Sequence, residues 1–186
     1  MISSAVGLVL ELLLVTEASY LAGDATLATG VVVGSFLASM GLGAWLTQFI
    51  ATQTDPHRGL LNSLLQVELL LCPLCLLGPL GLFVLFSVDG PLWPAIVVVT
   101  VFVGVLSGME LPLITRLLET QQSLRQALAQ VLALDYLGSL IGALLFPLIL
   151  LPWLGLLPTA GLLSVIPICC AGVCTALMGL ELGDYL

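Results

Sequence analysis

Six long apolar runs make up most of the chain, and short polar or turn-forming connections separate them. Each run is long enough to cross the hydrocarbon core of a bilayer as a helix, which takes about 20 residues. The runs lack the apolar–polar alternation of barrel strands, so we expect helices. The sequence therefore predicts an all-α fold, a polytopic integral membrane bundle of about six transmembrane helices in one domain, residues 1–186. The expected spans cover residues 2–21, 25–50, 60–86, 92–113, 127–151 and 158–180.

Composition agrees with a membrane protein and excludes several other classes. Of the 186 residues, 60% are hydrophobic and 8% are charged, whereas soluble domains carry about 25% charged residues. The chain has no lysine and only three arginines, so no basic patch is available to bind nucleic acid. The first run contains two glutamates and lacks a basic start, so we expect a retained helix and not a cleaved signal peptide.

The arginines predict an orientation in the membrane. They occur only in the second and fourth connections, at Arg58, Arg116 and Arg125. Because positively charged connections stay on the cytoplasmic side, positions 54 and 121 are expected in the cytoplasm and position 89 outside. The interpretation is a multi-pass protein of the bacterial inner membrane with both termini in the cytoplasm.

Four acidic residues fall inside the expected spans on the cytoplasmic side. At about 1.5 Å of rise per residue, Glu11, Glu68 and Asp135 lie roughly 12–14 Å deep, with Glu110 shallower. An ionised acid near the middle of a span costs roughly 2.5–3.5 kcal/mol, so these acids must be sheltered, protonated or paired. One interpretation is a candidate cation or proton site, or a polyamine-binding vestibule. The other is that each acid is protonated and donates a hydrogen bond to a neighbouring helix.

Small residues three or four positions apart predict close helix packing on two of the runs. These residues are Gly30, Gly34, Ala38 and Gly41 in the second run, and Gly138 and Gly142 in the fifth. Asp135 is three residues before Gly138 and therefore shares its helical face. We expect this acid to face another helix and not lipid.

Cysteines and the single histidine give little support for a metal site or for a thiol-based reaction. Cys72 and Cys75 form a Cys-x-x-Cys pair, but they lie in the middle of an apolar run with no histidine near them in the sequence. Cysteine is common there as a small apolar residue. His57 lies in a polar connection. We therefore expect no metal site, find no nucleophile–base pair, and identify no cofactor.

Several stretches resemble the membrane domain attached to many bacterial polyamine aminopropyltransferases, the spermidine synthase-like proteins. They are Glu11, GSFLASMGLGAW from Gly34, GMELPLITR from Gly108, and LALDYLGSLIGALLFPLILLPWLGL from Leu132. The resemblance covers nearly the whole chain. It implies a partner domain in the cytoplasm, Rossmann-like, that transfers an aminopropyl group from decarboxylated S-adenosylmethionine to an amine. Nothing after residue 180 provides the strands and glycine-rich turn of such a domain, so we expect no enzyme activity from this chain.

Two functions from different classes follow. The favoured one is a non-catalytic membrane subunit or scaffold, whose partners are the lipid bilayer and either other membrane subunits or a separate cytoplasmic domain. The alternative is a small transporter-like module that binds a cation or polyamine through its intramembrane acids. A scaffold needs an apolar or small-residue face left free for a partner, whereas a transporter needs acids that converge on a cavity.

Overall fold

The computed structural model describes residues 1–50, 56–119 and 123–183, and these ranges are helical apart from short turns, with no strand among them. The prediction of an all-helical chain is confirmed. The helices are α1 (Ile2–Ala22), α2 (Ala25–Leu46), the 3-10 turn η1 (Thr47–Phe49), α3 (Pro56–Ser87), α4 (Leu92–Glu119), α5 (Leu124–Leu145), the π-helical turn η2 (Phe146–Leu150), α6 (Leu151–Leu154) and α7 (Leu156–Gly183).

Five stretches within the described ranges are long and apolar enough to cross a membrane. They are Ile2–Ala22, Ala25–Phe49, Gly59–Ser87, Leu92–Glu119 and Leu124–Leu154. A further apolar stretch, Leu156–Cys170 in α7, is shorter. These stretches match the apolar runs of the sequence, because each proline inside α3 and α4 is accommodated without a break in the helix.

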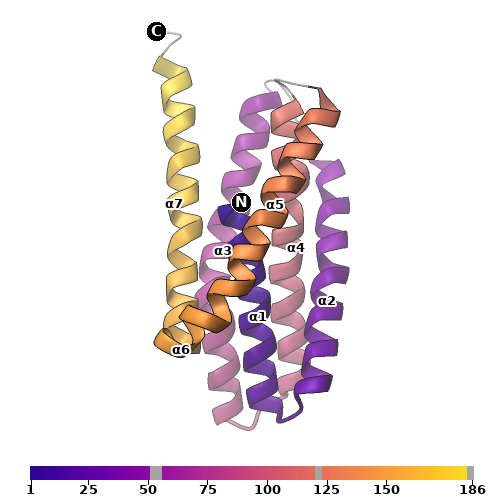
Figure 1. The fold of residues 1–186 in the computed structure, drawn as a ribbon, viewed down its shortest axis with the longest axis vertical. Coiled ribbons are helices and arrows are strands. Elements are labelled where there is room, and N and C mark those ends of the chain that lie inside the picture. Colours follow the sequence, from indigo (N-terminus) through magenta and orange to yellow (C-terminus); the bar gives the residue numbers. More distant parts are fainter. Residues whose placement is uncertain (51–55, 120–122, 184–186) are drawn as a thin grey trace.

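Successive helices run up and down, so the connections alternate between the two ends of the bundle (Figure 1). At one end, Gly23 closes α1 with a positive φ of 74°, a conformation that glycine adopts without strain. Asp24 then starts α2, because its side chain accepts hydrogen bonds from the amides of Thr26 and Leu27. The turn between α3 and α4 lies at the same end, whereas α2 and α4 finish at the opposite end (Figure 1).

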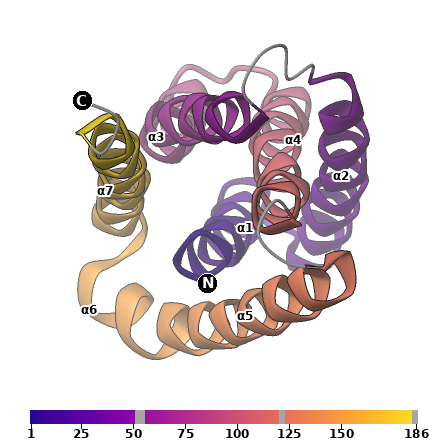
Figure 2. The same ribbon diagram turned by 90° about the horizontal axis from the view of Figure 1, so that it is seen from above.

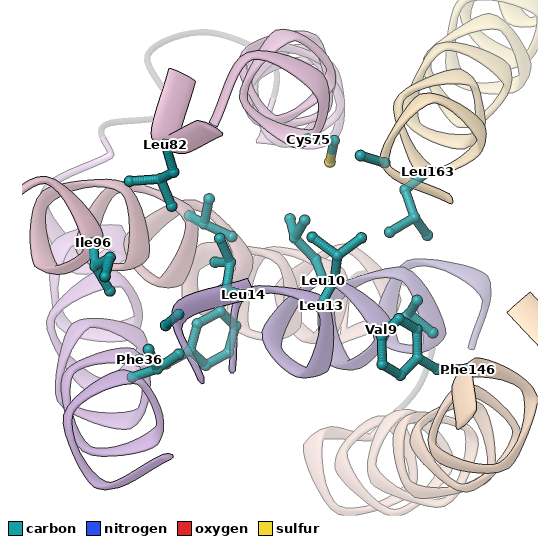
Figure 3. Packing of buried hydrophobic residues seen from close by; sticks show 14 of the residues in the cluster. Val9, Leu10, Leu13, Leu14, Phe36, Cys75, Leu82, Ile96, Phe146 and Leu163 are labelled. Carbon is teal, nitrogen blue, oxygen red and sulfur yellow. The ribbon is translucent and has the colours of Figure 1, made fainter. Parts of the chain in front are cut away.

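Helix α1 occupies the middle of the bundle, inside a ring formed by the other long helices (Figure 2). Its buried side chains include Leu10 and Leu13, which Figure 3 shows pointing into the space between α3 and α7. Cys75 of α3 and Leu163 of α7 belong to the same buried apolar cluster. A helix buried on most sides needs apolar residues all round, so the acids of α1 are exceptions that require explanation.

Helices α2 and α4 make the most extensive helix–helix contact among the described residues. A Cβ atom built on Gly43 would collide with the backbone of Val105, and one built on Gly108 would collide with the backbone of Met40. Glycine is therefore required for these backbones to approach each other. At the end of the same pair of helices, Arg116 of α4 donates a hydrogen bond of 2.8 Å to the carbonyl oxygen of Thr47, which caps the last turn of α2.

The structure differs from the expected spans at several helix ends. Helix α4 continues to Glu119, so Arg116 lies within the helix and not in a connection. Ser123 is the N-cap residue directly before α5, but its hydroxyl donates to the Gln126 side chain and accepts no hydrogen bond from a backbone amide. The fifth apolar run also contains the π-helical turn η2, which the periodicity of apolar residues did not predict.

Candidate functional site

A partly enclosed cavity of about 160 Å³ lies between α1, α2, α4 and α5. Three carboxyl groups line it: Glu11 of α1, Glu110 of α4 and Asp135 of α5. We call this space the acid cavity. Three of the four acids that the sequence identified are thus brought to one place, although they come from helices far apart in the sequence.

The fourth acid, Glu68 of α3, joins this group through a serine. Ser3 Oγ lies 3.3 Å from Glu68 Oε1 and is also hydrogen-bonded to Glu110 Oε2. Both glutamates are buried, with exposed fractions of 4% for Glu68 and 7% for Glu110. The first turn of α1 therefore links acids on α3 and α4.

Hydroxyl groups and apolar side chains complete the lining. Ser3, Ser4, Ser107 and Ser139 supply the hydroxyls, and Phe36, Met40 and Leu111 are among the apolar residues. Two polar atoms at the cavity, Ser107 Oγ and Glu110 Oε1, are buried and have no hydrogen-bond partner within the described chain. A buried polar atom without a partner is uncommon in folded proteins. Two residues of the cavity wall thus carry hydrogen-bonding capacity that the described chain does not use.

The glycines of α5 explain how Asp135 reaches the cavity. A Cβ atom on Gly138 would collide with the carbonyl oxygen of Met1, and one on Gly142 would approach the carbonyl oxygen of Ala5 to 2.7 Å. Helix α5 therefore lies directly on the first turns of α1. Because Asp135 is one turn from Gly138, its side chain lies beside the start of α1 at the cavity wall.

The other predicted packing glycines lie elsewhere. Gly30, Gly34 and Gly41 are exposed, and a Cβ atom on any of them would meet no atom of the described chain within 4 Å. Helix α2 packs instead through Gly43, because the face that also carries the bulky apolar residues Val32 and Phe36 is the buried one. The expected small-residue seam is thus a free face of α2 within this structure.

The cysteines and Glu17 lie apart from the acid cavity. Cys72 and Cys75 are free thiols, and Cys75 is completely buried in the apolar core. Across the part of the chain that the structure describes, no three His, Cys, Asp or Glu side chains are placed to hold a metal ion. Glu17 is also completely buried, on α1, and does not line the cavity.

Sequence analysis missed Ser3 as a member of the site. Ser3, Gly7 and Glu11 are four residues apart, so they share one face of α1, and all three line the acid cavity. Gly7 leaves room there, since an added Cβ atom would contact Ser107 Oγ at 3.7 Å. The sequence shows that a polar, a small and an acidic residue share this face. It does not show that the face packs against α4.

Comparison with known proteins gives one consistent result. The chain is 36% identical over 161 residues to polyamine aminopropyltransferase 2 of Ralstonia nicotianae, covering 86% of this chain and 31% of that protein. It is 37% identical over 165 residues to polyamine aminopropyltransferase 1 of Streptomyces coelicolor, covering 88% and 30%. It is 31% identical over 169 residues to the polyamine aminopropyltransferase of Leptospira interrogans, covering 89% and 32%.

No family model matches the chain, and no solved structure is significantly similar to it. The chain spans about a third of the length of the curated relatives that it matches. The resemblance that the sequence motifs indicated is therefore confirmed: over nearly nine-tenths of its length, this chain is similar to one region of the polyamine aminopropyltransferases.

Proposed function

We propose that this chain is a membrane module that binds a small organic cation in the acid cavity. The observation that carries the proposal is the convergence of acids from separate helices, Glu11, Glu110 and Asp135, on one cavity. Carboxylate and hydroxyl oxygens accept the hydrogen bonds that an ammonium group donates. A bound cation would also offset the repulsion among acids that have few basic residues near them in this sequence.

The size of the cavity favours an organic cation over a bare ion. A cavity of about 150 Å³ holds a molecule the size of benzene, with six non-hydrogen atoms, and the acid cavity measures about 160 Å³. Its apolar residues suit a short alkyl chain. The relatives are named for polyamines, which combine ammonium groups with short apolar chains. The relatives' name also refers to aminopropyl transfer. We assign that reaction to the region of the relatives that this chain does not match.

In the proposed membrane arrangement, the chain crosses the bacterial inner membrane six times with both termini in the cytoplasm. The alternating ends of the helices and the arginines Arg116 and Arg125 at one end support this orientation. A cysteine placed at Asp89, in a variant without the native cysteines, should react with an impermeant thiol reagent added to intact cells. Positions 54 and 121 lie outside the described residues. Labelling of position 121 from outside would contradict the orientation.

Cation binding can be tested with 1,4-diaminobutane, which has six non-hydrogen atoms. We expect it to raise the thermal unfolding midpoint of the purified full chain at neutral pH, because a ligand that binds only the folded state stabilises it. At about 100 times Kd, the added stability is about 2.7 kcal/mol. Asp135→Asn and Glu110→Gln should weaken the effect, since both keep the size of the side chain but remove its negative charge.

Two controls separate this binding from a general effect of the amine. The diol 1,4-butanediol has the same length and no charge, so it should not stabilise the protein. Asp89→Asn removes an acid from the distant turn at the other end of α3, and this variant should respond to the diamine like the unmodified chain. Equal stabilisation by diamine and diol, or an unchanged response in Asp135→Asn and Glu110→Gln, would refute a cation site in the cavity.

A second candidate function, a scaffold that docks a partner, is favoured by the free face of α2. Gly30, Gly34 and Gly41 are exposed along one side of the helix and offer a close approach to another helix. Bulk at Gly34 is expected to leave the isolated chain folded but to displace a partner held on this face. An unchanged size of the complex extracted from native membranes carrying Gly34→Leu would refute docking there.

A further inference from the structure

The link between Glu68, Ser3 and Glu110 constrains the protons at the cavity. Ser3 Oγ is within hydrogen-bonding reach of an oxygen atom of each glutamate, one on α3 and one on α4. A serine hydroxyl has a single proton to donate, and its lone pairs accept hydrogen bonds. If both carboxyl groups were ionised, Ser3 could donate its proton to only one of them. The nearby oxygen of the other carboxylate would then face the lone pairs of Ser3 Oγ.

One added proton resolves this conflict. A protonated carboxyl group can donate to Ser3 Oγ, which in turn donates to the ionised carboxylate of the other glutamate. Both contacts then become hydrogen bonds. Two buried carboxylates that share one site repel each other, so the pair Glu68–Glu110 is best accommodated with one proton as long as no cation lies beside it.

Glu110 also connects this pair to the ligand space. It lines the acid cavity, it is 7% exposed, and its second oxygen, Oε1, is buried with no hydrogen-bond partner in the described ranges. An ammonium group in the cavity would lie beside the Glu110 carboxyl group and would favour the ionised form of the pair. The proton of the pair is then no longer required.

We propose that the Glu68–Ser3–Glu110 group exchanges its proton for the cation, so that each cation bound in the acid cavity releases one proton to the solvent. The proposal rests on the proposed cation site. Charge is balanced for a single ammonium group: one positive charge enters and one leaves. For a diamine, the second ammonium group is matched by the other acids of the cavity, Glu11 and Asp135.

The charged and titratable groups around Glu110 come from three neighbouring helices. They are Glu11 and the amino group of Met1 on α1, Glu68 with the thiols of Cys75 and Cys72 on α3, and Asp135 on α5. The segment Ala25–Leu46, which forms α2, contains no titratable side chain. On α4 itself, Arg116 is engaged with the carbonyl oxygen of Thr47. Within the described residues, Glu68 and Glu110 are the two acids that share a single hydroxyl group, so we assign the released proton to this pair.

The test is calorimetric titration of the purified full chain with 1,4-diaminobutane in two buffers that differ in their heat of protonation. The difference in binding heat counts the protons released, and we expect a value near one. The apparent affinity should rise about tenfold per pH unit between about pH 6 and 8, where primary amines remain protonated. In Glu68→Gln, the proton count and the pH dependence should fall below those of the unmodified chain, because Glu110 no longer shares a proton with a second carboxyl group.

Glu17→Gln is the matched control, since Glu17 is a buried acid on α1 that does not line the cavity. It should leave the proton count unchanged. Binding whose heat is the same in both buffers would refute proton exchange while leaving the cation site intact. Absence of binding at every pH, in protein whose unfolding transition shows that it is folded, would instead refute the cation site and the exchange together.

Discussion

Replacing Gly43 with leucine is expected to destabilise the folded protein by about 3 kcal/mol or more. A Cβ atom at this position would collide with the backbone of Val105 on α4, so the two helices must separate before any side chain can fit. Overpacking of a well-packed contact costs about 1–3 kcal/mol, and a collision with backbone is at the upper end because it cannot be relieved by a change of rotamer. The loss can be measured as a lower thermal midpoint of the purified chain in detergent.

Gly34→Leu provides a matched control on the same helix. Gly34 is exposed, and an added Cβ atom would meet no atom of the described chain within 4 Å. Leucine also has a higher helix propensity than glycine, by roughly 1 kcal/mol or less, so the variant should be as stable as the unmodified chain or slightly more stable. Equal destabilisation by the two variants would show that α2 does not pack on α4 through Gly43.

Replacing Glu17 with methionine is expected to stabilise the protein by about 1–3 kcal/mol. Glu17 is completely buried, and both of its carboxyl oxygens lack a hydrogen-bond partner in the part of the chain that the structure describes. Methionine has a similar length and an unbranched, adaptable shape, so it can fill the same space without a polar group. The increase can be measured as a higher thermal midpoint in detergent.

Glu17→Gln tests whether the gain comes from removing a polar group. Glutamine keeps the size and the polarity of the side chain, so its stability should stay close to that of the unmodified chain. If methionine lowered the stability while glutamine did not, Glu17 would have a polar partner that the described contacts do not include. Glu17 would then serve a purpose beyond packing on α1.

The fold could be predicted from the sequence largely because each apolar run has one dominant property, its length. The length of a run defines a helix that can cross a bilayer, whatever its neighbours are. Helix ends were less certain. Leu117 and Leu118 continue the apolar pattern of α4 past the expected end at residue 113, so the helix reaches Glu119. The π-helical turn Phe146–Leu150 accommodates one extra residue within a helical turn. The spacing of apolar residues does not predict where this happens.

The candidate site could be predicted only in part, because spacing along a helix gives relative position and not the neighbour. The depth of Glu11, Glu68, Glu110 and Asp135 was available from counting, but their meeting around Ser3 and the acid cavity depends on how four helices are rotated. Similarly, α2 has two faces with small residues. The sequence indicated Gly30, Gly34 and Gly41, whereas α4 packs on the face of Gly43.

The hydrogen bond from Arg116 to the carbonyl oxygen of Thr47 gives one residue two roles at different times in the life of the protein. In the proposed orientation, Arg116 is one of three positive charges that keep the neighbouring helix ends on the cytoplasmic side while the chain is being inserted. Once α2 and α4 have come together, the same guanidinium group holds the end of α2. Arginine at this position therefore contributes both to the proposed insertion and to the finished fold, whereas Arg125, in the first turn of α5, is the simpler position at which to alter orientation alone.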